Sequence, residues 1–209
     1  ALVLTMPDSS GPPLRILHVV RAPVGGIFRH ILDLTAGQIE RGHAVGIVAD
    51  SQTGGERADA TFREIGPRLK LGIHRIPIHR QPYPSNVLSA LRVLRLARSL
   101  KPDVLHGHGA QAGVFVRLRG RSKTAIRVYT PHGGSLHYAP DTLNGALYAR
   151  LERALMNRTD LFLFESAFAR DTYQRVVGKP ASLVRCVFNG VTASEFDPVT
   201  PAEDATDVV

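Results

Sequence analysis

Short apolar runs alternate with longer amphipathic segments along almost the whole chain. Continuous apolar runs predict strands at residues 14–20, 44–49, 71–78, 104–106, 125–129, 161–164 and 183–188. Helical spacing of apolar residues predicts helices near 27–41, 57–66, 84–101, 109–120, 143–158 and 167–178. Continuous apolar strands separated by helices are typical of a parallel sheet covered on both faces. With right-handed crossovers, the pattern predicts an α/β fold: a doubly wound, Rossmann-like sheet of about seven strands.

The two ends of the chain differ in composition from its middle. Residues 1–13 are rich in proline, serine and glycine, which favours a disordered tail. Residues 14–198 carry all the predicted elements and should form one Rossmann-like domain. Residues 199–209 contain proline and acidic residues and then turn apolar, as a linker into another strand would. We therefore expect 199–209 to begin a linker to a carboxy-terminal domain that these residues do not include.

Composition and length narrow the class of protein. A chain of 209 residues, 44% of them hydrophobic, can bury roughly 70% of the surface that its unfolded form exposes. Cys186 is the only cysteine, so an internal disulfide is impossible and a reducing compartment is favoured. No stretch approaches the roughly 20 apolar residues that span a bilayer, and the first residues lack the features of a signal peptide. We expect a cytoplasmic protein.

The charge of the chain favours anionic partners. The formal net charge is +8, which suits nucleotide phosphates, acidic lipids or nucleic acids. Aromatic residues make up only 6% of the chain and tryptophan is absent, so we expect no nucleic-acid partner. The basic residues of two predicted helices could form a patch that meets an anionic membrane, or they could be an ordinary solvated surface. They are Arg92, Arg95, Arg98, Lys101, Arg117, Arg119, Arg121 and Lys123.

Four short polar signatures lie where predicted strands end. In an open α/β sheet, ligands bind in the crevice beyond the carboxyl ends of the strands, so these signatures should line one site. They are Gly25-Gly26-Ile27-Phe28-Arg29-His30, His106-Gly107-His108-Gly109, Thr130-Pro131-His132-Gly133 and Asn189-Gly190-Val191.

The glycine pair after the first strand is a candidate phosphate site. Gly25 and Gly26 would let the backbone approach a ligand closely, and the free amides at the start of the next helix favour a phosphate. A tight turn without a ligand is the plain alternative. The segment lacks the spacing and the third glycine of the dinucleotide fingerprint, although Asp50 ends the second strand, where a dehydrogenase would hold ribose.

The histidines form the second candidate feature. We expect His106 and His108 to follow the fourth strand and His132 to follow the fifth. Without an acidic or cysteine partner at a recognised spacing they are weak evidence for a metal, and hydrogen-bonded loop residues would explain them as well. His132 is the strongest candidate, because Pro131 and Gly133 fix and open the backbone around it.

Taken together, these motifs resemble the amino-terminal, acceptor-side domain of GT-B glycosyltransferases of family 4. The resemblance runs from about Leu14 to Pro198 and includes Ser166 after the sixth strand. No single motif is specific, but their order and strand placement are.

The resemblance implies transfer of a sugar from a nucleotide-sugar donor, such as a UDP- or GDP-sugar, to an acceptor. Anomeric configuration would be retained, with no cofactor and no required metal ion. Gly25 and Gly26 would face the donor diphosphate, and His132 would be the catalytic residue beside the transferred sugar. The other implied residues are Arg29, His30, His108 and Gly133 on the acceptor side and Asn189 at a hinge.

The resemblance also bears on what this chain does alone. The second domain of the family, which holds the nucleotide, is missing, so we expect the isolated domain to be inactive. A sugar or lipid-linked acceptor in cell-surface polysaccharide or glycolipid synthesis is expected, with the enzyme peripheral on the inner face of the membrane. A sugar-nucleotide epimerase or a non-catalytic sugar-nucleotide binding module on the same scaffold is the open alternative, because a fold does not determine a reaction.

Overall fold

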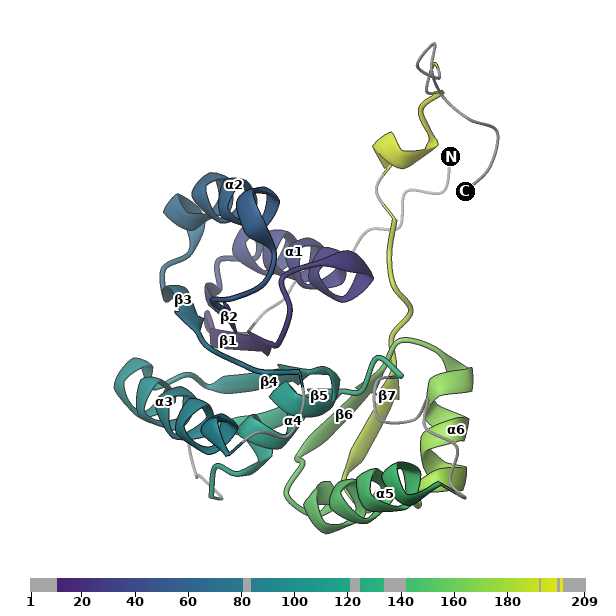
Figure 1. Cartoon of the computed structure of the whole chain (residues 1–209). Helices are drawn as coiled ribbons and strands as arrows, with labels where there is room; N and C mark the ends of the chain where they lie inside the picture. Colours follow the sequence, from purple (N-terminus) through teal and green to yellow (C-terminus); the bar gives the residue numbers. More distant parts are fainter. Residues whose placement is uncertain are drawn as a thin grey trace.

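One seven-stranded parallel sheet organises the protein (Figure 1). The computed structural model describes residues 11–80, 84–120, 125–133, 142–191, 193–198 and 200. Within them the strand order is β3-β2-β1-β4-β5-β6-β7, and every neighbouring pair is parallel. The strands are β1 (Arg15–Val20), β2 (Ala44–Asp50), β3 (Gly72–Ile76), β4 (Val104–His108), β5 (Ile126–Thr130), β6 (Leu161–Phe164) and β7 (Leu183–Cys186).

Six α-helices connect the strands and confirm the alternating pattern expected from the sequence. They are α1 (Gly25–Glu40), α2 (Gly55–Ile65), α3 (Ser85–Leu100), α4 (Gly109–Arg117), α5 (Leu143–Met156) and α6 (Ala167–Val176). The described residues also include two short 3-10 turns, η1 (Gly66–Arg68) and η3 (Ala193–Phe196). The predicted fold class is therefore confirmed as a doubly wound, Rossmann-like α/β fold.

Two element boundaries change the chemistry expected from the sequence. The fourth strand continues to His108, so the prediction that His106 and His108 follow it is wrong: both lie inside β4. The first helix begins at Gly25 rather than near Ile27, so the glycine pair forms its first two residues. The histidines are therefore held by the sheet, and the glycines present helix amides.

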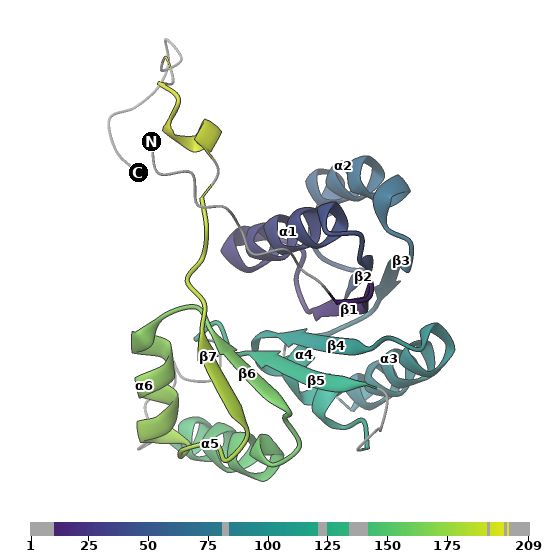
Figure 2. The same ribbon diagram turned by 180° about the vertical axis from the view of Figure 1, so that it is seen from behind.

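The two faces of the sheet are covered by different helices (Figure 2). On one face, Val45, Ile47 and Ala49 of β2 pack with Phe28 and Ile31 of α1 and with side chains of α2. The intervening residues of the same strands, such as Val48 of β2, point to the other face. Apolar side chains therefore lie on both faces of these strands, as expected of strands covered on both sides.

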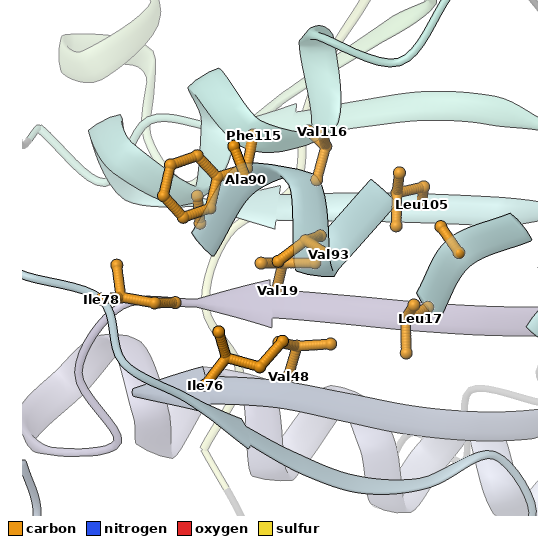
Figure 3. Close-up of a cluster of buried hydrophobic side chains, with 12 residues drawn as sticks. Leu17, Val19, Val48, Ile76, Ile78, Ala90, Val93, Leu105, Phe115 and Val116 are labelled. Atoms are coloured by element: carbon orange, nitrogen blue, oxygen red, sulfur yellow. The ribbon is translucent and has the colours of Figure 1, made fainter. Parts of the chain in front are cut away.

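The opposite face packs against α3 and α4 (Figure 3). Leu17 and Val19 of β1 and Leu105 of β4 contact Val93 of α3 and Val116 of α4, and all five side chains are fully buried. Burial of this kind contributes roughly 1.5–3 kcal/mol for each large aliphatic side chain.

The prediction that Arg117 belongs to a basic surface patch is wrong. Its side chain is fully buried, and its Nη1 donates to Oε2 of Glu152 at 2.7 Å. The guanidinium also lies 3.9 Å from the centre of the Tyr129 ring, and the hydroxyl of Tyr129 donates to Glu152 at 2.9 Å. Arg117 therefore belongs to an internal ion pair that joins α4 to α5. Arg121 and Lys123 lie outside the described residues.

The chain leaves the sheet after β7 and runs past α1 towards η3 (Figure 2). Arg29 of α1 forms an ion pair with Glu195 of η3 at 3.0 Å. Among the helices that the structure describes, none combines the length and the apolar character needed to cross a membrane. Most of the tail and linker expected at 1–13 and 199–209 falls outside the described residues.

Candidate functional site

The start of α1 provides an uncapped helix amino terminus at the carboxyl edge of the sheet. The preceding residue, Val24, is extended and offers no side-chain cap, and the first turn contains no acidic residue among those described. The first amides of α1 are therefore not satisfied by a capping side chain, and the helix dipole favours an anion there.

A cavity of about 420 Å³ opens beside this helix terminus, between α1 and α2. Its lining includes the backbone of Gly25 and Gly26 and the side chains of Arg29 and Arg57. A Cβ atom added at Gly26 would meet nothing within 4 Å, so folding alone does not require glycine there. The backbone amides and the guanidinium of Arg57 suit a negatively charged ligand, whereas the guanidinium of Arg29 is already paired with Asp33 and Glu195.

Five histidines gather at the same edge of the sheet, on the face covered by α1. His18 of β1 is in register with His106 of β4, and His108 lies two residues further along β4. Because side chains two residues apart in a strand point to the same face, all three rings project towards α1. His30 of α1 and His132 after β5 complete the group, with their ring centres 5.2 Å apart.

Hydrogen bonds connect these rings into a chain. Nε2 of His18 lies 2.8 Å from Oε1 of Gln38, and Nδ1 of His18 lies 3.0 Å from Nε2 of His108. Nδ1 of His108 in turn lies 3.1 Å from Nε2 of His132. His106 stands beside this chain and contacts the hydroxyl of Thr130 at 2.9 Å.

Burial keeps the histidine rings neutral. Loss of hydration lowers the pKa of His18 and of His132 from 6.5 to about 4. The same cause lowers the pKa of His106 and His108 well below 6.5, and the neighbouring histidines add to the effect. The pKa of half-buried His30 is also lowered by burial. Neutral imidazoles can each donate one hydrogen bond and accept another.

The backbone at His132 is unusual. Its φ is 50°, a left-handed conformation that residues with side chains rarely adopt, and Gly133 follows with a φ of 70°. Strained backbone of this type clusters at binding and catalytic sites. The ring is half-buried against His108 and His30.

The remaining predicted residues fall in varied positions. His108 is only 1% exposed and uses both ring nitrogens internally, so it supports the site from behind rather than lining it. Asn189 is exposed in the segment beyond β7. Asp50 is buried and accepts a hydrogen bond from the amide of Ile78, which leaves it no access to a ribose. Ser166 caps α6 by accepting from the amide of Ala169.

Sequence reasoning missed His18 and Gln38. His18 lies in an apolar run that predicts a buried strand, and Gln38 lies among ordinary helix residues. A signal was present, because a histidine inside a buried strand needs a polar partner on the same face. The partners became identifiable only once β1 and β4 were paired.

Among the residues that the structure describes, two groups of three histidines bring nitrogens within 4.8 Å of one another, as a metal site requires. They are His18, His106 and His108, and His30, His108 and His132. Both groups include His108, whose nitrogens already face His18 and His132. A bound ion would have to break one of these hydrogen bonds.

An uncapped helix terminus and a histidine cluster thus lie together at the carboxyl edge of a doubly wound sheet, where folds of this kind bind their ligands. A sequence profile for glycosyltransferase family 4 matches residues 24–195, so the chain belongs to this family. No curated protein matches the chain.

Solved GT-B structures share the fold. Anabaena HepE, in complex with UDP and glucose, is 16% identical with a TM-score of 0.62, over 85% of this chain and 45% of that one. A glycosyltransferase from Rickettsia africae is 18% identical with a TM-score of 0.64, over 90% and 47%. Sucrose-phosphate synthase from Thermosynechococcus elongatus is 14% identical with a TM-score of 0.63, over 89% and 50%. The present chain thus spans about half the length of these neighbours.

Proposed function

We propose that this chain is the acceptor-side domain of a retaining glycosyltransferase that takes a sugar from a UDP- or GDP-sugar. The observation that carries the proposal is the convergence of the glycine start of α1 and the histidine cluster at one edge of the sheet. His30 connects the two, because it lies one helical turn beyond Gly26 and its ring is 5.2 Å from that of His132. HepE, solved with UDP and glucose, supports the donor class.

Each part of the site has a role in this transfer. The amides of Gly25 and Gly26 bind the donor diphosphate, and Arg29, which is paired with Asp33 and Glu195, lies on the acceptor side. His132 hydrogen-bonds the transferred sugar and stabilises the positive charge of an oxocarbenium-like transition state, since preorganised polar groups are a large catalytic term. His30 and Gly133 lie on the acceptor side, and Asn189 is the hinge. No cofactor and no metal ion is needed.

An apolar groove favours a lipid-linked acceptor. A second cavity of about 420 Å³ lies between α3, α4 and α5, and its lining includes Leu91, Leu94, Phe115 and Leu151. The groove reaches Ala110 and Gln111 at the start of α4, so one end lies at the carboxyl edge of the sheet, on the face opposite the histidine cluster. We assign this groove to the hydrocarbon chain of the acceptor.

Basic residues favour an anionic membrane at the other end of the groove. Arg95 and Arg98 are exposed and lie one helical turn beyond the groove residues Leu91 and Leu94. Arg119 is close enough that its pKa is lowered, by burial first and then by the charge of Arg98. An enzyme held on the inner face of the membrane, in polysaccharide or glycolipid synthesis, fits this arrangement.

The membrane contact can be measured with vesicles. Vesicles containing phosphatidylglycerol should bind the chain, and added salt should weaken the binding. An Arg95→Gln/Arg98→Gln variant should bind less. Binding that is equal for neutral and anionic vesicles would count against the membrane surface.

The glycine site has a sharp test because a Cβ at Gly26 would meet nothing within 4 Å. The test uses the longest gene product. There, the Gly26→Leu variant should have a free energy of unfolding within about 0.5 kcal/mol of the wild-type value. It should raise KM for the donor by about tenfold, because the side chain would fill the space of the diphosphate. Gly120→Ala is the matched control, since a Cβ there also meets nothing within 4 Å. An unchanged KM for the donor would contradict the assignment of the diphosphate to this turn.

Two further measurements separate the alternatives. Calorimetry of the 209-residue chain alone with UDP and GDP should find no micromolar binding, because the chain spans only about half the length of its solved neighbours. An assay of the same chain with a UDP- or GDP-sugar should find no sugar transfer. Product analysis of the longest gene product decides between reactions. An altered sugar nucleotide without transfer would identify an epimerase, and binding without turnover would identify a non-catalytic module.

A further inference from the structure

The hydrogen bonds of Gln38, His18, His108 and His132 form an unbroken path from α1 to the site. The three contacts measure 2.8, 3.0 and 3.1 Å, and each one uses a different ring nitrogen. His18 and His108 are each at most 1% exposed, so water does not compete for their nitrogens. Each ring is therefore restricted to partners within this path.

The side-chain oxygen of Gln38 determines which nitrogen donates and which accepts in each of these hydrogen bonds. Oε1 of Gln38 can only accept, so Nε2 of His18 must carry the proton. A neutral ring has one proton, so Nδ1 of His18 accepts from Nε2 of His108. The same rule makes Nδ1 of His108 accept from Nε2 of His132, which leaves Nδ1 of His132 as an acceptor.

We propose that Gln38, His18 and His108 are positioning residues that fix the proton of His132 on Nε2 and keep its Nδ1 as an acceptor for a ligand hydroxyl. The inference deepens the proposed function and rests on it only for the identity of the ligand. An acceptor nitrogen suits a sugar hydroxyl, which donates, and its lone pair faces any positive charge that develops on the sugar. The left-handed backbone at His132 holds the ring in this orientation.

Other polar groups nearby do not define the same path. His106 contacts Thr130 and lies tilted against His108 with ring centres 3.9 Å apart, and His30 contacts His132 through its ring. Neither ring is a link between Gln38 and His132. We call this path of Gln38, His18, His108 and His132 the histidine relay. It predicts that a substitution at Gln38 changes which ring nitrogen of His132 carries the proton, although three hydrogen bonds separate the two residues.

The direct test is a nuclear magnetic resonance spectrum of the chain with ¹⁵N-labelled histidine, recorded with EDTA at pH 7.5. Two-bond ¹H–¹⁵N couplings report which ring nitrogen carries the proton. Wild type should show the Nε2–H tautomer at His18, His108 and His132. Gln38→Met removes the acceptor with little change in size, and His132 should become a mixture of both tautomers.

Two variants keep the test decisive. Gln38→Glu retains an acceptor oxygen and should preserve the wild-type tautomers, which also covers a failure of Gln38→Met to fold. Gln174→Met is the matched control, because Gln174 lies in α6, outside the path and the groove. An Nδ1–H tautomer at wild-type His132 would overturn the proposal. The proposal would also be overturned if Gln38→Met changed the tautomer of His18 alone. The same holds if the wild-type spectra recorded with and without EDTA differed, because a bound metal would then determine the tautomers.

The second readout is kinetic and needs the longest gene product. Gln38→Met should lower kcat for transfer by at least about tenfold with an unchanged KM for the donor, and Gln38→Glu should restore kcat. The spectra test the relay even if no sugar is transferred, so failure of the proposed function and failure of the relay remain distinguishable. A normal kcat in a variant with mixed His132 tautomers would show that the relay does not contribute to catalysis.

Discussion

Acidification should destabilise this protein through its buried histidines. Burial lowers the pKa of His18 and of His132 to about 4, whereas in the unfolded chain each has a pKa near 6.5. Between these values the unfolded chain binds protons that the folded chain does not. The stabilisation is therefore complete above pH 6.5 and is lost progressively as pH falls towards 4.

The size of the effect follows from the pKa difference. One pKa unit corresponds to 1.36 kcal/mol, so a group shifted from 6.5 to about 4 costs about 2 kcal/mol by pH 5. His18 and His132 together should remove about 4 kcal/mol, a large part of the roughly 5–15 kcal/mol that stabilises a typical domain. The pKa values of His106 and His108 shift in the same direction.

Urea unfolding at pH 7.5, 6 and 5 measures this loss. His18→Gln keeps a hydrogen-bonding side chain that does not titrate, so it should lose about 2 kcal/mol less than wild type over this range. His43→Gln, at a histidine outside the cluster, shows whether the difference is specific to buried rings. Equal losses in wild type and His18→Gln would refute the assignment of the pH dependence to the cluster.

The internal packing supports further predictions. Arg117→Met should cost about 3–5 kcal/mol in unfolding free energy, because the buried ion pair with Glu152 and the contact of the guanidinium with the Tyr129 ring would both be lost. Arg117→Met/Glu152→Met should recover part of that loss. Gly113→Ala should cost about 1–3 kcal/mol, because its Cβ would lie 2.2 Å from Cε2 of Tyr129. Thermal unfolding checks both, with Gly120→Ala expected near wild type. A stable Gly113→Ala protein would contradict the close approach of α4 to β5.

Much of the fold was readable from the order of residues. Continuous apolar runs predicted seven strands and the segments between them predicted six helices, because strands buried on both faces cannot alternate apolar and polar residues. The position of the candidate site also followed, because all strands of a parallel sheet end at the same edge. The glycine pair and His132 were selected as candidates on that basis, together with the glycine and proline residues around them.

The histidine relay and the internal ion pair depended on tertiary structure. His18 and His106 lie 88 positions apart, and they meet only because β1 pairs with β4 in one particular register. Arg117 was expected at the surface, and its burial depends on how α4 and α5 approach each other. Local sequence determines which segments form helices and strands. Which polar groups share a buried space depends on strand order and packing, since contacts between distant segments form only when the whole chain is folded.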